Sequence, residues 1–137
     1  MRNNVFAVID TNVIVSALLS KDFNASTVQV FRAIIDMRIT PLYNDEIFQE
    51  YNDVLSRSKF NFAKENVKNV LSVFKTNGIN IKRRKIEDEI FPDPKDIVFY
   101  EVAMSKEDAF LVTGNIKHFP TKPFVVTPSQ MIAILNQ

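Results

Sequence analysis

The stretch that decides the fold is Val5–Leu19, which reads VFAVIDTNVIVSALL. Its first part, Val5–Ile9, is a continuous apolar and β-branched run, typical of a strand buried on both faces of a parallel sheet. Asp10 follows this run directly. Apolar residues then resume with the spacing of a helix face, at Val13, Ile14, Ala17 and Leu18. Asp10 therefore lies where a buried strand gives way to a helix, and in open α/β sheets that crevice binds ligands. Simple capping of the helix by Asp10 is the competing interpretation.

The rest of the chain repeats this alternation of strand and helix. Asn-Gly hairpin signals between strands are missing, so the order predicts an α/β fold with helices on both faces of a mostly parallel sheet. Pro41 favours an edge position for its strand, and Gly78 is expected as the residue that ends a helix. The expected strands are Ile39–Tyr43, Ile79–Ile81, Ala109–Thr113 and Phe124–Val126, and the expected helices are Ser26–Met37, 45–56, Glu65–Asn77, 96–104 and the segment after Thr127-Pro128.

Length and composition indicate one domain over residues 1–137. Having only two Gly argues against a Gly-rich nucleotide loop, and having no Cys excludes a disulfide framework, a thiol nucleophile and a thiolate metal site. The apolar runs are too short for a signal sequence or a membrane span, so we expect a soluble, cytoplasmic protein. The net charge of +1 neither supports nor excludes a nucleic-acid partner.

One charged run stands out, since Lys82–Lys85 leads directly into Glu87–Glu89. It is interpreted either as a solvated loop whose charges pair with each other or as a patch that binds phosphates.

Three further polar residues fall at positions like that of Asp10. Glu50 borders the apolar face of a helix, Asp96 opens an apolar helix, and Asn115 follows a later strand. Converging carboxylates repel each other unless a cation neutralises them. Oxygen ligands suit Mg²⁺ or Mn²⁺, and two such ions about 4 Å apart can catalyse in-line displacement at phosphorus. The lone His118 is interpreted as a surface or turn residue rather than a catalytic base.

Four segments, taken in order, resemble a PIN domain, and more narrowly the bacterial and archaeal PIN proteins described as toxins of toxin–antitoxin pairs. The four segments are Asp10–Leu18, Glu50–Leu55, Asp93–Asp96 and Leu111–Asn115. The resemblance covers nearly the full chain. It implies a three-layer α/β/α sandwich with a central, mostly parallel sheet of four to five strands.

The resemblance also implies a metal-dependent endoribonuclease that leaves a 5′-phosphate and a 3′-hydroxyl. Asp10, Glu50 and Asp96 would be both catalytic residues and metal ligands, and Asn115 would be a further catalytic residue. Many PIN nucleases have an acid at that last position, so Asn115 weakens the expectation of a second metal ion. The proposed substrate-binding residues are Asn12, Thr113 and Lys117, with Lys59 and Lys82–Lys85 as further candidates for contacts to single-stranded RNA.

The sequence also leads to expectations about partners and leaves two rival functions open. The resemblance implies a small antitoxin protein and a homodimer. One rival is a phosphatase or phosphotransfer domain with Asp10 as nucleophile, although Asn12 stands where haloacid-type phosphatases have an acid. The other is a catalytically weak PIN domain that binds RNA or protein, an alternative that Asn115 keeps open.

Overall fold

A computed structural model describes residues 4–85 and 89–137. These residues contain one five-stranded sheet, in which every neighbouring pair of strands is parallel and the order is β3-β2-β1-β4-β5. The strands are β1 (Val5–Ile9), β2 (Ile39–Tyr43), β3 (Ile79–Asn80), β4 (Phe110–Val112) and β5 (Val125–Val126). The predicted α/β class and parallel sheet are confirmed.

The described residues also form six α-helices that flank this sheet. They are α1 (Thr11–Leu19), α2 (Ser26–Ile35), α3 (Asp45–Leu55), α4 (Lys64–Asn77), α5 (Ile97–Met104) and α6 (Pro128–Leu135). The four helices that were predicted with both ends, α2 to α5, begin and end within two residues of the predicted range. Short 3₁₀ turns stand at Ser58–Phe60, Pro94–Asp96 and Ile116–His118.

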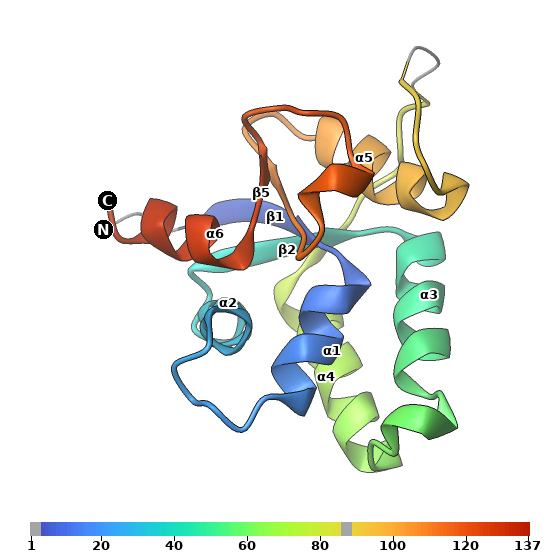
Figure 1. The fold of residues 1–137 in the computed structure, drawn as a ribbon, viewed down its shortest axis with the longest axis vertical. Helices are drawn as coiled ribbons and strands as arrows, with labels where there is room; N and C mark the ends of the chain where they lie inside the picture. Colours follow the sequence, from blue (N-terminus) through green and yellow to red (C-terminus); the bar gives the residue numbers. More distant parts are fainter. Residues whose placement is uncertain (1–3, 86–88) are drawn as a thin grey trace.

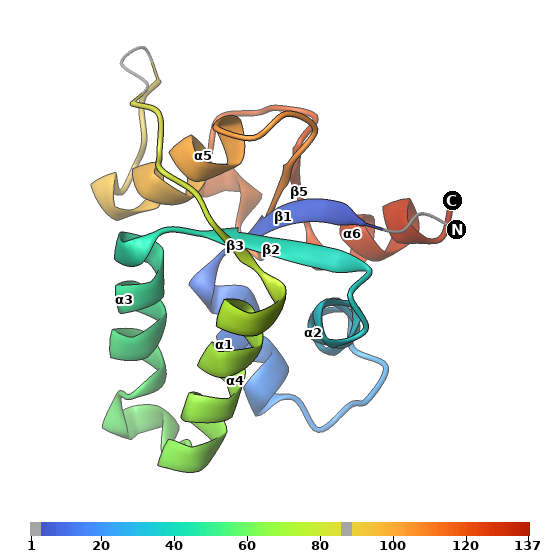
Figure 2. The same cartoon turned by 180° about the vertical axis from the view of Figure 1, so that it is seen from behind.

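The elements form three layers (Figure 1). Helices α1 to α4 lie on one side of the sheet and α5 lies on the other, as the view from behind also shows (Figure 2). Helix α6 packs against α2. Helix α5 is buried from Val98 to Ala103, as its nearly uniform apolar sequence predicts. Among the described helices, none has the length and apolar character that crossing a membrane requires.

Strand β1 occupies the centre of the sheet, and the chain changes direction around it. From β1 the chain moves to β2 and β3 on one side, then returns to add β4 and β5 on the other. The carboxyl ends of β1 and β4 therefore flank the switch point at which open α/β sheets bind ligands. Asp10 follows β1 and Thr113 follows β4, so both residues lie at this point.

The prediction that Pro41 places its strand at the edge of the sheet is wrong. Strand β2 pairs with β1 on one side and with β3 on the other. Residues two apart in a strand direct their backbone groups to the same neighbour, and the carbonyl of Tyr43 faces β3, where it accepts from the amide of Ile81. The missing N–H of Pro41 therefore faces the β3 side, at a level where β3 has not yet begun.

Gly78 ends α4 as predicted, but it does not adopt the left-handed conformation that usually favours glycine at the end of a helix. Its φ of −106° is open to any residue, so no left-handed cap requires glycine. A Cβ at this position would lie 2.5 Å from the carbonyl oxygens of both Phe74 and Pro41. Glycine is therefore needed because the end of α4 approaches the backbone of β2 closely.

We expect Gly78→Ala to lower the free energy of unfolding by about 2 kcal/mol, since a methyl group forced against fixed backbone must shift α4 or β2. Gly114→Ala is the matched control, because its Cβ would meet nothing nearer than the Asn12 side chain at 3.5 Å. Urea denaturation followed by circular dichroism measures both. Equal losses in the two variants would contradict the close-approach explanation.

Candidate functional site

Asp10 occupies the N-cap position of α1, yet its carboxylate makes no capping hydrogen bond. Instead it accepts a hydrogen bond of 2.7 Å from the hydroxyl of Thr113, which lies just beyond β4. Asp10 is only 7% exposed and Thr113 is fully buried. Asp10 is thus held at the junction of β1 and β4, and capping alone does not account for it.

The environment of Asp10 opposes its negative charge. The pKa of Asp10 is raised to about 6, chiefly by burial; the Thr113 hydrogen bond lowers it, and the carboxylates of Asp96 and Glu50 contribute to the increase. The electrostatic influence of Asp96 and Glu50 places these two carboxyl groups in the neighbourhood of Asp10. Asp96 and Glu50 thus act electrostatically on Asp10, and the convergence of the three acids on one cation stays a prediction.

Glu50 reaches this neighbourhood from the middle of α3. Its carboxylate accepts a short hydrogen bond from the hydroxyl of Thr11, the first residue of α1. The next residue, Tyr51, is fully buried and donates its hydroxyl to the carbonyl of Ile9, the last residue of β1. Two adjacent residues of α3 thus bond Thr11 and Ile9, the residues that flank Asp10 in the chain, and this holds the middle of α3 beside Asp10.

Asp96 closes the short turn that precedes α5, and its side chain makes no capping hydrogen bond. Among the described residues, no donor lies within hydrogen-bond distance of its buried Oδ2, and His118 Nδ1 stands 3.6 Å away. Burial raises the pKa of Asp96, with further contributions from Asp93 and Glu50 that His118 partly offsets. A buried carboxylate oxygen without a donor is costly, unless a cation completes its surroundings.

Asn115 connects two of these groups. Its backbone amide donates to the Thr113 hydroxyl at 3.0 Å, and its side-chain nitrogen lies 2.9 Å from His118 Nε2. Since an amide nitrogen can only donate, this contact assigns the ring proton to Nδ1, on the side that faces Asp96. The prediction that His118 is a turn residue holds for its position, but the sequence interpretation missed its contact with the site.

Two of the proposed substrate-binding residues are engaged with the protein itself. Asn12 Oδ1 accepts from the amide of Gly114 at 3.2 Å, and Thr113 serves Asp10 and Asn115 as described. Lys117, by contrast, is exposed in the turn Ile116–His118. These contacts give Asn12 and Thr113 a positioning role, and substrate binding by Asn12, Thr113 and Lys117 stays a prediction.

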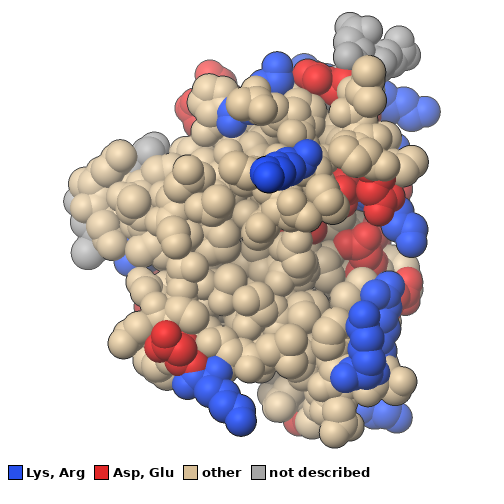
Figure 3. Space-filling model, viewed as in Figure 1, with Lys and Arg blue, Asp and Glu red and all other residues tan. Residues whose placement is uncertain are grey.

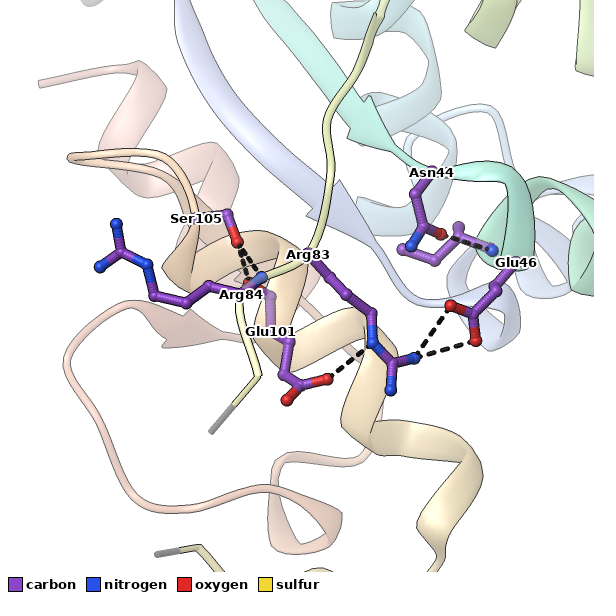
Figure 4. A network of polar contacts seen from close by, with 7 residues as sticks. Asn44, Glu46, Arg83, Arg84, Glu101 and Ser105 are labelled. Atoms are coloured by element: carbon purple, nitrogen blue, oxygen red, sulfur yellow. Dashed lines mark hydrogen bonds and ion pairs between the residues drawn. The ribbon is translucent and has the colours of Figure 1, made fainter. Parts of the chain in front are cut away.

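Arg83 joins α3, the helix of Glu50, to α5, the helix that Asp96 directly precedes (Figure 4). Its guanidinium lies 2.9 Å from Glu46 of α3 and 2.9 Å from Glu101 of α5. The backbone of Arg84 is fastened next to it, since its amide donates to the hydroxyl of Ser105. Arg83 is therefore a bridge between α3 and α5, with its charge already compensated.

The two interpretations of the charged run are resolved only in part. Arg83 pairs with Glu46 of α3 and with Glu101 of α5, and Glu89 forms an ion pair of 3.4 Å with Lys122. The expected pairing with Glu87 and Asp88 lies outside the described residues. Lys82, Arg84 and Lys85 are exposed, so a phosphate contact by these three stays a prediction. Lys59 lies over the ring of Phe60, at 5.1 Å from its centroid.

The arrangement can concentrate negative charge but does not form a closed metal site. Within residues 4–85 and 89–137, no three His, Cys, Asp or Glu side chains are placed so that they could hold a metal ion as they stand. Acidic side chains nevertheless gather on the right-hand side of the molecule, where α3 faces the start of α5 (Figure 3). Such a crevice attracts cations and, through them, anionic substrates.

From the sequence, Thr11 and Tyr51 are assigned no role, and His118 is interpreted as a surface or turn residue without a link to the site. Thr11 and Tyr51 directly follow Asp10 and Glu50, and His118 lies three residues after Asn115. For Thr11 and Tyr51 the available signal was their position directly after a candidate acid. It was not used because Thr11 resembles an ordinary first-turn residue, and Tyr51 fits the apolar face of its helix.

The fold and the site together define a class, an α/β protein with acidic side chains at the carboxyl ends of a parallel sheet. The family model described as PIN domain matches residues 7–117. The chain therefore belongs to the PIN domain family, whose members are generally nucleases that use divalent metal ions. Comparison with curated proteins and with solved structures returned no match. Family membership gives no support to the alternative of a phosphorylated Asp10.

Proposed function

We propose that this protein is a metal-dependent endoribonuclease that cleaves single-stranded RNA. The observation that carries the proposal is the meeting of Asp10, Glu50 and Asp96 in one electrostatic neighbourhood, with the pKa of Asp10 raised to about 6. Three acids, Asp10 after β1, Glu50 in α3 and Asp96 in the turn before α5, repel one another and destabilise the fold, and a bound cation would remove this cost.

The residues fit a hard divalent cation such as Mg²⁺ or Mn²⁺. The donors are carboxylate oxygens, which such ions prefer, and the buried Oδ2 of Asp96 accepts no hydrogen bond from the described residues. Asp10, Glu50 and Asp96 would hold one ion, or two. The ion would supply a more acidic bound water and charge neutralisation on the phosphate.

The protein's own groups orient these acids. Thr113 fixes one oxygen of Asp10, Thr11 fixes Glu50, and Asn115 turns the His118 ring so that its proton faces Asp96. The exposed Lys117 would contact the RNA backbone. Attack by water, activated at this site, would leave a 5′-phosphate and a 3′-hydroxyl.

A toxin role in a type II toxin–antitoxin pair is the finer part of this proposal. It is supported by the resemblance of the four sequence segments, and it brings with it an antitoxin partner and a homodimer. Exposed apolar side chains of the kind that dimers cover are present at Leu19, Phe23, Ile35 and Met37. Light scattering of the purified chain tests the dimer directly.

A catalytically weak module that binds RNA or protein is the second candidate function. Asn115 supports it, because the turn after β4 offers an amide where many PIN nucleases have an acid. That amide is already engaged by His118. The absence of a ready-made metal arrangement in the described residues points the same way.

We expect Glu50→Gln and Asp96→Asn each to reduce Mg²⁺- or Mn²⁺-dependent cleavage of single-stranded RNA by at least about a hundred-fold, since each removes a proposed ligand. Asp53→Asn is the matched control, because Asp53 is an exposed acid on the same helix as Glu50, and its carboxylate accepts a hydrogen bond from Gln49. A gel assay with a labelled oligoribonucleotide measures the rates. Cleavage that persists in both site variants would contradict the assignment, and RNA binding without metal-dependent cleavage would favour the module.

A further inference from the structure

A groove separate from the acidic crevice runs between α3, α4 and the segment that joins them. Its volume is about 620 Å³. Its floor is apolar and includes Phe48 of α3, Phe62 of the joining segment and Leu71 of α4, all of them half-buried. An occupant must therefore bring apolar side chains of its own to cover this floor.

The rim of the groove is positively charged. The charged residues that line it are Arg57, Lys64, Lys68 and Lys75, and no Asp or Glu lines it. Among the described residues none of these four cations forms an ion pair. The chain as a whole carries only +1, so the positive charge is a local feature, and Lys and Arg side chains gather at the end of the molecule where α3 and α4 are joined (Figure 3).

The groove faces away from the acidic crevice. On α3, Phe48 and Asn52 line the groove while Glu50 points to Thr11. Residues two apart in a helix are separated by about 200° around its axis, so groove and crevice lie on opposite flanks of α3. RNA held for cleavage at the crevice does not need to enter the groove.

The aromatic rings of the groove are also poorly placed for stacking with bases. Lys75 lies over the Phe48 ring, 5.4 Å from its centroid, and Phe62 is stacked on Phe60, with 5.4 Å between centroids. Binding of single strands relies on free aromatic faces beside the cations. The combination of an apolar floor and a cationic rim instead fits an amphipathic helix with acidic flanks.

We propose that the α3–α4 groove is the docking site for an acidic amphipathic helix of a partner protein. The cations of α4 extend from Lys64 to Lys75, about 16 Å at 1.5 Å per residue, which corresponds to about three turns of a docked helix. Apolar side chains of that helix cover Phe48, Phe62 and Leu71, and its carboxylates face the rim. The proposal is independent of catalysis at Asp10, Glu50 and Asp96.

The test uses the full-length protein and a synthetic, fluorescein-labelled peptide of 16 residues, with Leu at helical spacing on one face and Glu on its flanks. A peptide of the same composition with Leu distributed around the helix is the control probe. We expect saturable anisotropy changes with the first peptide, weakened at least ten-fold by Lys68→Glu/Lys75→Glu and left unchanged by Lys21→Glu. All three lysines are exposed, so the fold is not at risk.

Several results would overturn the proposal. They are equal binding of the two peptides, equal weakening by Lys21→Glu, or no effect of the groove variant. If the groove variant Lys68→Glu/Lys75→Glu loses binding to a single-stranded oligoribonucleotide in EDTA but still binds the peptide, the groove would be assigned to RNA instead. Asp10→Asn must bind the peptide as the unmodified protein does, and this separates failure of the docking site from failure of the nuclease proposal.

Discussion

Asp10→Asn is expected to abolish metal-dependent RNA cleavage and, without divalent cations, to make the protein more stable at neutral pH. The loss of activity should be about a thousand-fold, because the substitution removes a ligand charge at the centre of the site. The gain in stability follows from burial, since a neutral amide at this 7% exposed position is not opposed by Asp96 and Glu50.

The pH dependence of this stability difference has a definite sign. The folded protein binds the Asp10 proton with a pKa of about 6, against an ordinary value of 3.8. The resulting stabilisation is fully present below pH 4 and is lost as the pH rises through 6, a change of about 3 kcal/mol. Asp10→Asn has no carboxyl group to lose this proton. The variant should therefore be more stable than the unmodified protein above pH 7, and the two stabilities should approach each other near pH 4.

Thermal unfolding in EDTA across pH 4 to 8 measures this difference. Adding Mg²⁺ or Mn²⁺ at pH 7.5 should raise the Tm of the unmodified protein, since an ion that binds only the folded state stabilises it, and should barely change that of Asp10→Asn. Asp53→Asn, with an exposed carboxylate, is the control for charge removal. If the stability of Asp10→Asn relative to the unmodified protein is lower at pH 8 than at pH 4, the raised pKa of Asp10 is not the cause of the difference.

Arg83→Ala is expected to lower the free energy of unfolding by about 3 kcal/mol. Glu101 is 2% exposed and lies 2.9 Å from the guanidinium, and removing the cation beside a buried carboxylate costs several kcal/mol. The substitution also disconnects α3 from α5. Because Glu50 lies on α3 and Asp96 directly precedes α5, RNA cleavage should fall even at temperatures where the variant is folded.

The other end of the same bridge supplies the control. Glu46 is 62% exposed in its side chain, so Glu46→Gln should cost less than about 1 kcal/mol, as usual for surface ion pairs. Arg83→Lys keeps the charge but not the forked guanidinium that reaches both acids. It should therefore lower the free energy of unfolding by more than Glu46→Gln and by less than Arg83→Ala. Urea denaturation orders the three variants, and equal effects of Arg83→Ala and Glu46→Gln would contradict burial of Glu101 as the cause.

Features decided by neighbouring residues were predictable from the sequence. The buried run before Asp10, the apolar periodicity of α4 and the Thr127-Pro128 start of α6 are local patterns, because strand pleat and helix turn repeat within a few residues. The capping box between Thr127 and Gln130 is local in the same way. The resemblance to a PIN domain made the candidate acids predictable as well as the helices and strands.

Contacts between distant segments were decided by the tertiary structure. Pro41 lies inside the sheet because β3 starts one residue beyond it, and Gly78 is required by the backbone of β2. Arg83 pairs with Glu46 and Glu101, which lie far from it in the sequence, and the α3–α4 groove exists only once the two helices pack. The sequence alone therefore determined the elements and the acids they carry, since these depend on local periodicity and residue type. Their partners were decided by packing, because desolvation and pairing depend on distances that only the folded chain defines.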